Sequence, residues 1–231
     1  MRKGVFVETS NVRRFRSALD QVRDTAKGQP GLMVARGRAG RGKTVAALNA
    51  YATGGGVFLR VWEDMTQAAF LSRLCFEACE LSPVQAARSK MEIIKSLEGN
   101  PRVVFVDEAD RLATSRIEDL RDIHDETGCP VVLIGEEGLY AKLNALRRLW
   151  SRVTQHVEFG PTSEEDILLY AAEAAGLQLS PEACHEVARI SEGDFRLVHT
   201  ALLKIEQAAK AKAVTQVQAD MVRTVCGKGR T

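Results

Sequence analysis

A run of eight residues has the composition and spacing of a phosphate-binding loop. It reads Gly37-Arg38-Ala39-Gly40-Arg41-Gly42-Lys43-Thr44 and matches G-x-x-x-x-G-K-[ST] at every fixed position. Glycines allow a tight turn in which successive backbone N–H groups point toward one anion. Lys43 can then reach the β- and γ-phosphates of a nucleoside triphosphate, and the Thr44 hydroxyl can ligate Mg²⁺. The glycine spacing does not fit the G-x-G-x-x-G loop of dinucleotide-binding proteins.

Two adjacent carboxylates follow an apolar run later in the chain. Asp107 and Glu108 come after Val103-Val104-Phe105-Val106, which is continuously apolar, as in a strand covered on both faces. Ligands of open parallel sheets bind outside the carboxyl ends of the strands. We therefore expect Asp107 to hold the Mg²⁺ shell, and Glu108 to orient or activate a water that attacks the γ-phosphate. The alternative is an acid pair at a helix start with no catalytic role.

The elements that must position these residues alternate along the chain. Apolar runs with β-branched residues predict strands at residues 31–35, 57–61, 103–107, 131–135 and 154–159. Helical periodicity is found at residues 11–27, 43–52, 66–81, 83–97, 115–127 and 137–150. Such alternation predicts an α/β fold of the P-loop type, with a five-stranded, mostly parallel sheet and helices on both faces.

The pattern becomes helical after residue 160. Hydroxyl caps followed by acids or proline predict helix starts at 162–166 and 180–182, and further helices are expected over 193–212 and 214–226. The sequence therefore predicts an ATPase-like domain at residues 1–160 and a small, all-helical domain at residues 161–231.

The two motifs and the helical tail together resemble the AAA+ ATPases. Residues 37–44 are similar to the Walker A element, residues 103–110 to the Walker B element, and residues 161–231 to the lid domain. The resemblance implies ATP and Mg²⁺ as cofactors. Residues 37–44 and Asp107 would bind the nucleotide, Thr44 and Asp107 the metal, and Lys43 and Glu108 would act in hydrolysis.

Two arginines fit the same family. Arg152 comes just before the last expected strand, where AAA+ proteins place an arginine finger that completes the site of a neighbouring subunit; Arg147 and Arg148 compete for this role. Arg196, in the motif Gly193-Asp194-Phe195-Arg196, resembles sensor 2, which reaches the γ-phosphate from the lid. The alternative for Arg196 is a helix-surface arginine.

One position departs from the family pattern. The fourth expected strand ends in Ile134-Gly135-Glu136, where sensor 1 is usually Asn or Thr. An acid at this point would repel phosphates unless another cation intervenes. Glu136 therefore puts the sensor role, and fast hydrolysis, in question.

The opening Thr9-Ser10-Asn11-Val12-Arg13-Arg14-Phe15, the short lid and the Gly-Asp-Phe-Arg motif are similar to the phage Mu B-type transposition ATPases. This resemblance implies ATP-dependent, largely sequence-independent binding of double-stranded DNA, and assembly with itself into a ring or helical homo-oligomer. It also implies target-DNA selection and activation of a transposase, with a weak ATPase that DNA or a partner stimulates. The alternative is an AAA+ loader or remodeller that acts on a protein partner such as a replicative helicase.

Basic side chains supply the candidate DNA contacts. The chain carries a net charge of +2, but this splits into +8 for residues 1–50, −10 for 51–203 and +4 for 204–231. The candidates in the acidic middle are Arg73, Arg88, Lys90, Arg111 and Arg116, and those of the basic tail are Lys204, Lys210, Lys212, Arg223, Lys228 and Arg230. For each of them a solvated surface charge is the alternative.

The composition, 45% hydrophobic and 27% charged over 231 residues, is that of a globular protein. No apolar run approaches the ~18 residues that a membrane span needs, so we expect no membrane contact and a cytoplasmic protein. Five cysteines without a C-x-x-C pair predict reduced thiols rather than a metal site.

Overall fold

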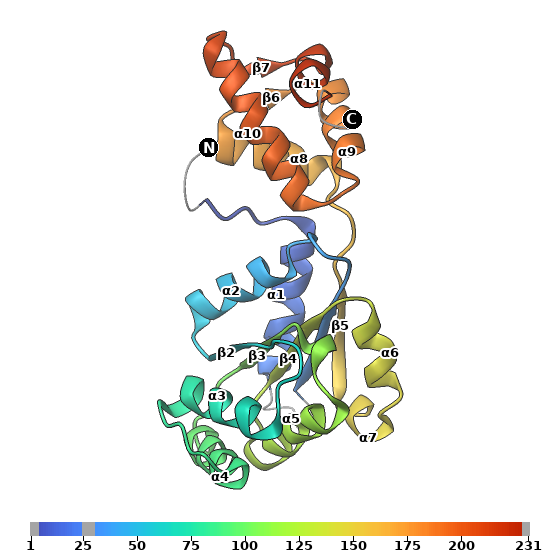
Figure 1. The fold of residues 1–231 in the computed structure, drawn as a ribbon. Helices are drawn as coiled ribbons and strands as arrows, with labels where there is room; N and C mark the ends of the chain where they lie inside the picture. The colour runs from blue at the N-terminus through green and yellow to red at the C-terminus, as the bar shows by residue number, and fades with distance from the viewer. Residues whose placement is uncertain (1–4, 25–30, 228–231) are drawn as a thin grey trace. The chain divides into compact units, whose positions relative to one another are not determined.

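The computed structural model describes residues 5–24 and 31–227, which divide into two compact units (Figure 1). The sheet unit comprises residues 14–37 and 43–158, outside the gap at 25–30. The helical unit comprises residues 38–42 together with the described parts of 1–13 and 159–231. The phosphate loop thus contributes residues to both units.

The sheet unit is built on five parallel strands. They are β1 (Leu32–Arg36), β2 (Val57–Arg60), β3 (Val104–Asp107), β4 (Val131–Gly135) and β5 (Val153–Glu158). Their order across the sheet is β2-β3-β4-β1-β5. The predicted five-stranded parallel sheet is therefore confirmed. Because β4 lies between β1 and β3, the residue after β4 stands between the phosphate loop and the acid pair.

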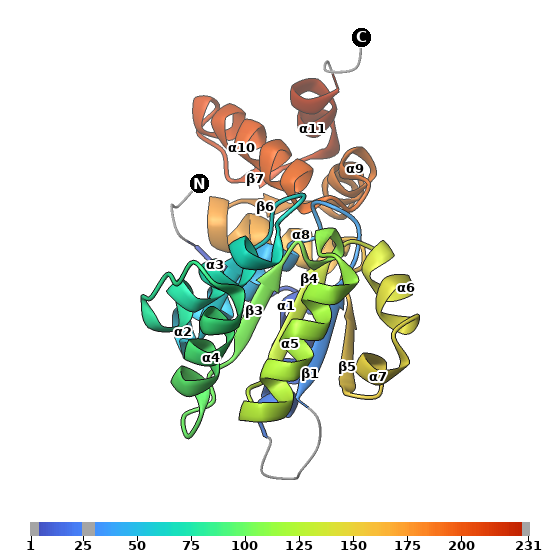
Figure 2. The ribbon, with the colours of Figure 1, turned by 60° about the horizontal axis from the view of Figure 1, so that its bottom comes forward.

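Helices cover both faces of this sheet (Figure 2). On one face lie α3 (Gln67–Cys79), α4 (Ala86–Leu97) and α5 (Thr114–Thr127), and on the other α1 (Ser10–Arg23) and α2 (Lys43–Gly54). Successive side chains of a strand point to opposite faces of the sheet. On the face covered by α3–α5, Leu32 and Val34 of β1 pack with Phe70, Leu74 and other buried residues of these helices. Of the helix expected at 11–27, residues 25–27 lie outside the described residues.

The prediction of one continuous helix over residues 137–150 is wrong. The segment contains two helices, α6 (Gly138–Asn144) and α7 (Arg147–Trp150). The backbone of Leu146 leaves the helical region, with φ −99° and ψ 77°. Leu139, Leu143 and Leu149 are all fully buried on both sides of this break. The apolar spacing therefore holds α6 and α7 on one core while the backbone bends between them.

The helical unit contains α8 (Glu164–Tyr170), a π-helical turn (Ala171–Ala175), α9 (Pro181–Ser191), α10 (Phe195–Ala211) and α11 (Ala219–Cys226). The predicted caps are confirmed, because the Ser163 hydroxyl accepts from the Asp166 N–H and the Ser180 hydroxyl from the Ala183 N–H. None of the helices in the described residues is both long and apolar enough to pass through a bilayer.

One detail of the helical tail differs from the expectation. Residues 214–217 do not begin a helix. Instead β7 (Gln216–Val217) pairs in parallel with β6 (Gln178–Leu179). The Gln178 N–H donates to the Thr215 carbonyl and the Ser180 N–H to the Val217 carbonyl, each at 2.9 Å. Val217 is thereby buried in the core of the unit, which a helix begun at 214 would not require.

Candidate nucleotide-binding site

The phosphate loop connects β1 to α2 through glycines whose backbone conformations other residues disfavour. The φ angle is +78° at Gly40 and +90° at Gly42. Both angles lie in the left-handed region, which glycine enters without the clash of a Cβ atom. Gly42 has open space where a Cβ would stand, so its requirement is conformational alone. The turn has the conformation that the sequence motif predicts.

The amino group of Lys43 is held beneath this loop. Lys43 is 9% exposed, and its Nζ donates to the Gly37 carbonyl at 2.6 Å. Burial lowers the pKa of Lys43. Nearby carboxylates act in the opposite direction, in decreasing order those of Glu136, Asp107, Glu108 and Asp110. The cation is thus held inside the turn by the Gly37 carbonyl, and the charges of the acid pair favour it.

The two residues predicted to hold the metal lie together. The Thr44 hydroxyl donates to the Asp107 carboxylate, with Oγ1 3.0 Å from Oδ2 and 3.2 Å from Oδ1. Asp107 is 2% exposed, and burial raises its pKa, an effect that the Thr44 hydrogen bond and the Arg60 charge oppose. A hydroxyl and a carboxylate are the hard oxygen ligands that Mg²⁺ prefers.

No group of three or more His, Cys, Asp or Glu side chains gathers around a common point in the described residues. A metal at Thr44 and Asp107 would therefore take its other ligands from phosphates and water. This is how Mg²⁺ is usually bound in nucleotide sites, so the residues present fit that ion.

Glu108 is held between two guanidinium groups. Arg60 Nη2 lies 3.1 Å from Oε1 and Arg111 Nε lies 3.2 Å from Oε2. The backbone of Glu108 has φ +59°, a left-handed conformation that costs a non-glycine residue about 1–3 kcal/mol. Strain of this kind is common where a side chain must be aimed at a reacting group. Each oxygen of the Glu108 carboxylate thus has one arginine partner, and its role as a general base stays a prediction.

Arg60 is the site residue that the sequence analysis missed. It ends β2 and stands opposite Asp107 in the β2–β3 register. Its Nε lies 3.6 Å from Asp107 Oδ2, so one guanidinium contacts both acids of the pair. The only signal in the sequence was that Arg60 is a basic residue near the end of the strand predicted at residues 57–61. Its meaning depends on β2 being the neighbour of β3.

Glu136 stands where the strand order predicts, beyond the end of β4. Its backbone N–H donates to Asp110 Oδ1 at 3.0 Å. A Cβ at Gly135 would lie 2.4 Å from the same oxygen, so this approach requires glycine there. Among the nearby carboxylates, Glu136 has the largest effect in raising the pKa of Lys43, against the lowering caused by burial. Lys43 is thus the cation that offsets this acid, while a sensor role for Glu136 stays a prediction.

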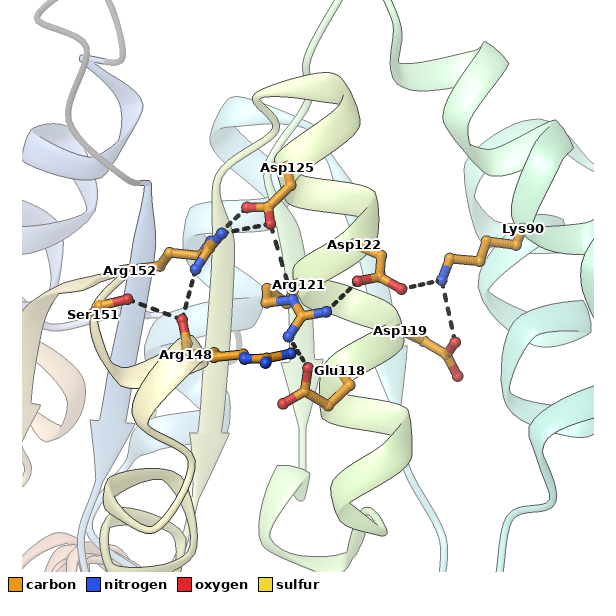
Figure 3. A network of polar contacts seen from close by, with 9 residues as sticks. All are labelled: Lys90, Glu118, Asp119, Arg121, Asp122, Asp125, Arg148, Ser151 and Arg152. Atoms are coloured by element: carbon orange, nitrogen blue, oxygen red, sulfur yellow. Dashed lines mark hydrogen bonds and ion pairs between the residues drawn. The ribbon is translucent and has the colours of Figure 1, made fainter.

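The predicted arginine finger is paired within its own chain (Figure 3). Arg152 donates from Nε and Nη2 to the two oxygens of Asp125, at 2.5 and 2.7 Å, and from Nη1 to the Arg148 carbonyl at 2.6 Å. This bidentate pair ties the start of β5 to α5. Arg147 and Arg148 are exposed, and within the described residues neither guanidinium has a hydrogen bond or an ion pair.

Arg196 lies in the first turn of α10, in the helical unit. Its side chain is exposed, and no partner for its guanidinium exists among residues 5–24 and 31–227. Its backbone N–H donates to Asp194 Oδ1 at 2.7 Å, so Asp194 caps the helix. A role in contacting phosphate stays a prediction.

Most of the candidate DNA contacts are paired with acids. Lys90 Nζ lies 2.6 Å from Asp122 Oδ2 and 3.3 Å from Asp119 Oδ1, as Figure 3 shows, and Arg116 Nε lies 3.0 Å from Asp119 Oδ2. The other pairs are Arg73 with Glu77, Arg111 with Glu108, Lys210 with Glu206, and Arg223 with Glu186. Arg88 is exposed and, in the described part of the chain, has no such partner. Lys228 and Arg230 lie outside the described residues.

A parallel sheet with a G-x-x-x-x-G-K-T loop after β1 and an acid pair after β3 defines a P-loop ATPase fold. Residues 25–143 match the family described as the AAA domain. The chain belongs to this family, and the predicted resemblance to AAA+ ATPases is confirmed.

Individual proteins extend this comparison. The chain is 31% identical to the Mu-like prophage FluMu DNA transposition protein B of Haemophilus influenzae, over 55% of this chain and 49% of that protein. It is 28% identical to the ATP-dependent target DNA activator B of Escherichia phage Mu, over 70% and 54%. The solved structure of the Aeropyrum pernix ORC2 protein aligns with all of this chain, and the alignment covers 71% of the ORC2 chain. The TM-score is 0.68 and the sequence identity is 15%. The chain spans about half the length of the curated relatives that it matches.

Proposed function

We propose that this chain is a Mg²⁺-dependent ATPase of the Mu B type, which binds double-stranded DNA when it holds ATP. The observation that carries the proposal is the meeting of Thr44 and Asp107 next to the buried amino group of Lys43. This combination supplies a cation for phosphates and a two-oxygen site for Mg²⁺. A protein named as an ATP-dependent target DNA activator aligns with 70% of the chain.

The residues divide the work of hydrolysis between them. The loop amides and Lys43 bind the β- and γ-phosphates, and Thr44 and Asp107 hold the metal. Bound Mg²⁺ neutralises charge on the phosphate oxygens during transfer. Glu108 orients the attacking water and accepts its proton. Arg152 and Arg196 remain the predicted contributions of a neighbouring subunit and of the lid.

The pairing of Glu108 supports a slow basal rate. A carboxylate whose two oxygens are each paired with a guanidinium is less free to rotate toward a water. Arg60 and Arg111 are 63% and 46% exposed in their side chains, so a polyanion can reach both. We infer that phosphates of DNA compete for these arginines and release Glu108, which would give a DNA-stimulated ATPase.

The proposals for DNA, self-assembly and a transposase partner rest on the family resemblance and on the relatives' names rather than on the site. The matched proteins are named for DNA transposition and for activation of target DNA. We therefore propose that this chain forms a homo-oligomer on duplex DNA, selects or delivers target DNA, and activates a transposase. Action on another protein partner, such as a replicative helicase, is the competing outcome of the same experiments.

ATP binding and hydrolysis by Lys43→Ala and Glu108→Gln test this proposal. Lys43→Ala should lose ATP binding, because it removes the buried cation. Glu108→Gln should bind ATP like the wild type and lose at least about 10²-fold in kcat, the usual contribution of a general base. Lys95→Ala, an exposed change on α4, is the matched control. ATP binding that survives Lys43→Ala, or hydrolysis that survives Glu108→Gln, contradicts the assigned site.

A further inference from the structure

The phosphate loop is hydrogen-bonded to the turn that precedes α10. The Phe195 N–H donates to the Gly40 carbonyl at 2.9 Å, and Arg41 Nη1 donates to the Glu192 carbonyl at 3.0 Å. Residues 38–42 and 159–231 belong to the same compact unit. Two consecutive loop residues, Gly40 and Arg41, are therefore fixed by residues 192–195.

Two glycines make this approach possible. A Cβ at Gly40 would lie 2.0 Å from Asp194 Oδ2 and 2.3 Å from its Cγ. A Cβ at Gly193 would lie 2.4 Å from Arg41 Nη1 and 2.3 Å from Pro161 Cβ. Both glycines also have positive φ angles, +78° and +70°. The loop and the turn are thus packed so closely that a Cβ at Gly40 would displace the Asp194 carboxylate, and one at Gly193 would meet Arg41 and Pro161.

The turn at residues 192–195 is also fixed by hydrogen bonds that do not involve the phosphate loop. The Gly193 carbonyl accepts from both the N–H and the hydroxyl of Thr162, each at 3.0 Å. The Asp194 N–H donates to the Ser191 carbonyl at 2.8 Å, and its carboxylate caps α10. The donor at Phe195 is therefore held in place by hydrogen bonds that do not involve the loop, and it offers the Gly40 carbonyl a fixed anchor.

This anchor determines where the next loop amide points. In a trans peptide the C=O and the following N–H point in opposite directions, and the described residues contain no cis peptide. Fixing the Gly40 carbonyl toward α10 therefore turns the Arg41 N–H away from it. That N–H has no acceptor among the described residues. It is an oriented, unpaired donor in a loop whose motif binds phosphate.

We propose that residues 192–195 are a positioning element for the phosphate loop. The Phe195 N–H fixes the Gly40 peptide so that the Arg41 N–H is aimed at a nucleotide phosphate before the nucleotide arrives. Pre-orientation of a donor strengthens binding because less freedom is lost when the ligand binds. The inference rests on the proposed ATP binding, and it gives the helical unit a part in that binding which does not depend on the side chain of Arg196.

A single backbone donor can be removed here without interrupting α10. Phe195 is the first residue of α10, a position that favours proline because no helical hydrogen bond uses its N–H. Asp194 has φ −77° and ψ 117°, the extended conformation that a residue before proline requires. Phe195→Pro therefore removes the donor to Gly40, and its ring Cδ displaces the Gly40 carbonyl from its anchored position. Phe195→Ala is the matched reference, because both changes remove the ring that packs on Tyr170 and only the proline removes the N–H.

The measurements are the Kd for Mg²⁺-ATP, the KM and kcat of hydrolysis, and the melting temperature of each variant. Phe195→Pro should bind ATP about 3- to 10-fold more weakly than Phe195→Ala, the effect of one hydrogen bond. The loss should appear in KM with kcat changed less than about twofold. A purely structural role would instead lower the melting temperature of Phe195→Pro and leave its KM equal to that of Phe195→Ala.

The Arg41→Ala variant provides a second measurement if the proline variant does not fold. It removes the bond to Glu192 but keeps the Arg41 N–H, and a rise of about twofold or more in KM supports the proposal. Equal ATP affinity of the two Phe195 variants, or an unchanged KM in Arg41→Ala, overturns the positioning role while ATP binding stands. A wild-type protein that binds no ATP overturns the proposed function itself, and this inference falls with it.

Discussion

Glu108 combines a left-handed backbone with a carboxylate that is paired on both oxygens. Its backbone is left-handed, and both carboxylate oxygens are paired with arginines from different elements, Arg60 of β2 and Arg111 of the turn after β3. The first feature aims the side chain and the second restrains it. A general base that is oriented by its backbone and held by two arginines would suit an ATPase that becomes active only after DNA has bound.

Arg60→Ala tests this restraint. Removal of one guanidinium should free Glu108, so the ATPase rate without DNA should rise severalfold and the stimulation by DNA should fall. The comparison is a steady-state ATPase assay with and without duplex DNA, with Lys95→Ala as the control. Lys95 is exposed on α4, pairs with Glu92 and is not among the candidate DNA contacts. A basal rate that falls in Arg60→Ala, with ATP affinity intact, would mean that Arg60 assists catalysis rather than delays it.

At the scale of elements, the strands were predictable because their signal is local. The runs at 103–106 and 131–134 are apolar without interruption, and both became fully buried strands. The break between α6 and α7 was not predictable, since leucines at helical spacing continue through Leu146. The β6–β7 pair was missed because two residues are too short to show a period.

The contrast between local and long-range signals also applies to the residues of the candidate nucleotide-binding site. Residues 37–44 and the acid pair are contiguous motifs, so their chemistry could be read from their types and order. Arg60 and the Arg152–Asp125 pair join residues that are distant in sequence. Such contacts depend on strand order and helix placement, for which the sequence holds no local signal. Pairing of Lys90 with Asp119 and Asp122 of α5 went unpredicted for the same reason.

The link between α5 and β5 leads to a prediction about Arg152. Arg152→Ala and Asp125→Ala should each lower the melting temperature by about 2–4 °C, since each breaks one partly exposed bidentate pair worth about 1 kcal/mol. If Arg152 also acts on a neighbouring subunit, as the family resemblance implies, only Arg152→Ala should abolish ATPase activity in the assembled state.

Thermal melting and ATPase assays on the same preparations separate these effects. Arg148→Ala is the matched control, because the Arg148 side chain has no pair in the described residues and its loss should leave the melting temperature unchanged. Hydrolysis that survives Arg152→Ala but is lost in Arg148→Ala would assign the finger to Arg148 and leave Arg152 with the structural pair alone.

At the scale of the whole molecule, the charge distribution limits how DNA can be bound. The net charge is only +2, and most candidate contacts in the acidic middle of the chain are already neutralised by carboxylates. A single chain should therefore bind DNA weakly. Tight binding would need many copies, each adding a few phosphate contacts, which agrees with the proposed homo-oligomer.

Arg88 and Arg116 offer a direct comparison of a free and a paired cation. The slope of log affinity against log salt reports the number of phosphates contacted, and loss of one contact reduces it by about 1. Arg88→Ala should reduce the slope per bound chain, whereas Arg116→Ala, whose partner is Asp119, should leave it unchanged. The measurement is a salt titration of duplex binding in the presence of ATP. Equal slopes for the wild type and Arg88→Ala would remove Arg88 from the DNA contacts.

Binding of a fluorescently labelled duplex with ATP, with ADP and without nucleotide is the most direct test of the central claim. The wild type should bind the duplex at least about 10-fold more tightly with ATP than with ADP or no nucleotide, and Glu108→Gln should remain bound because it cannot hydrolyse ATP. Equal duplex binding under all three conditions, in a protein shown to hold ATP, would contradict the account.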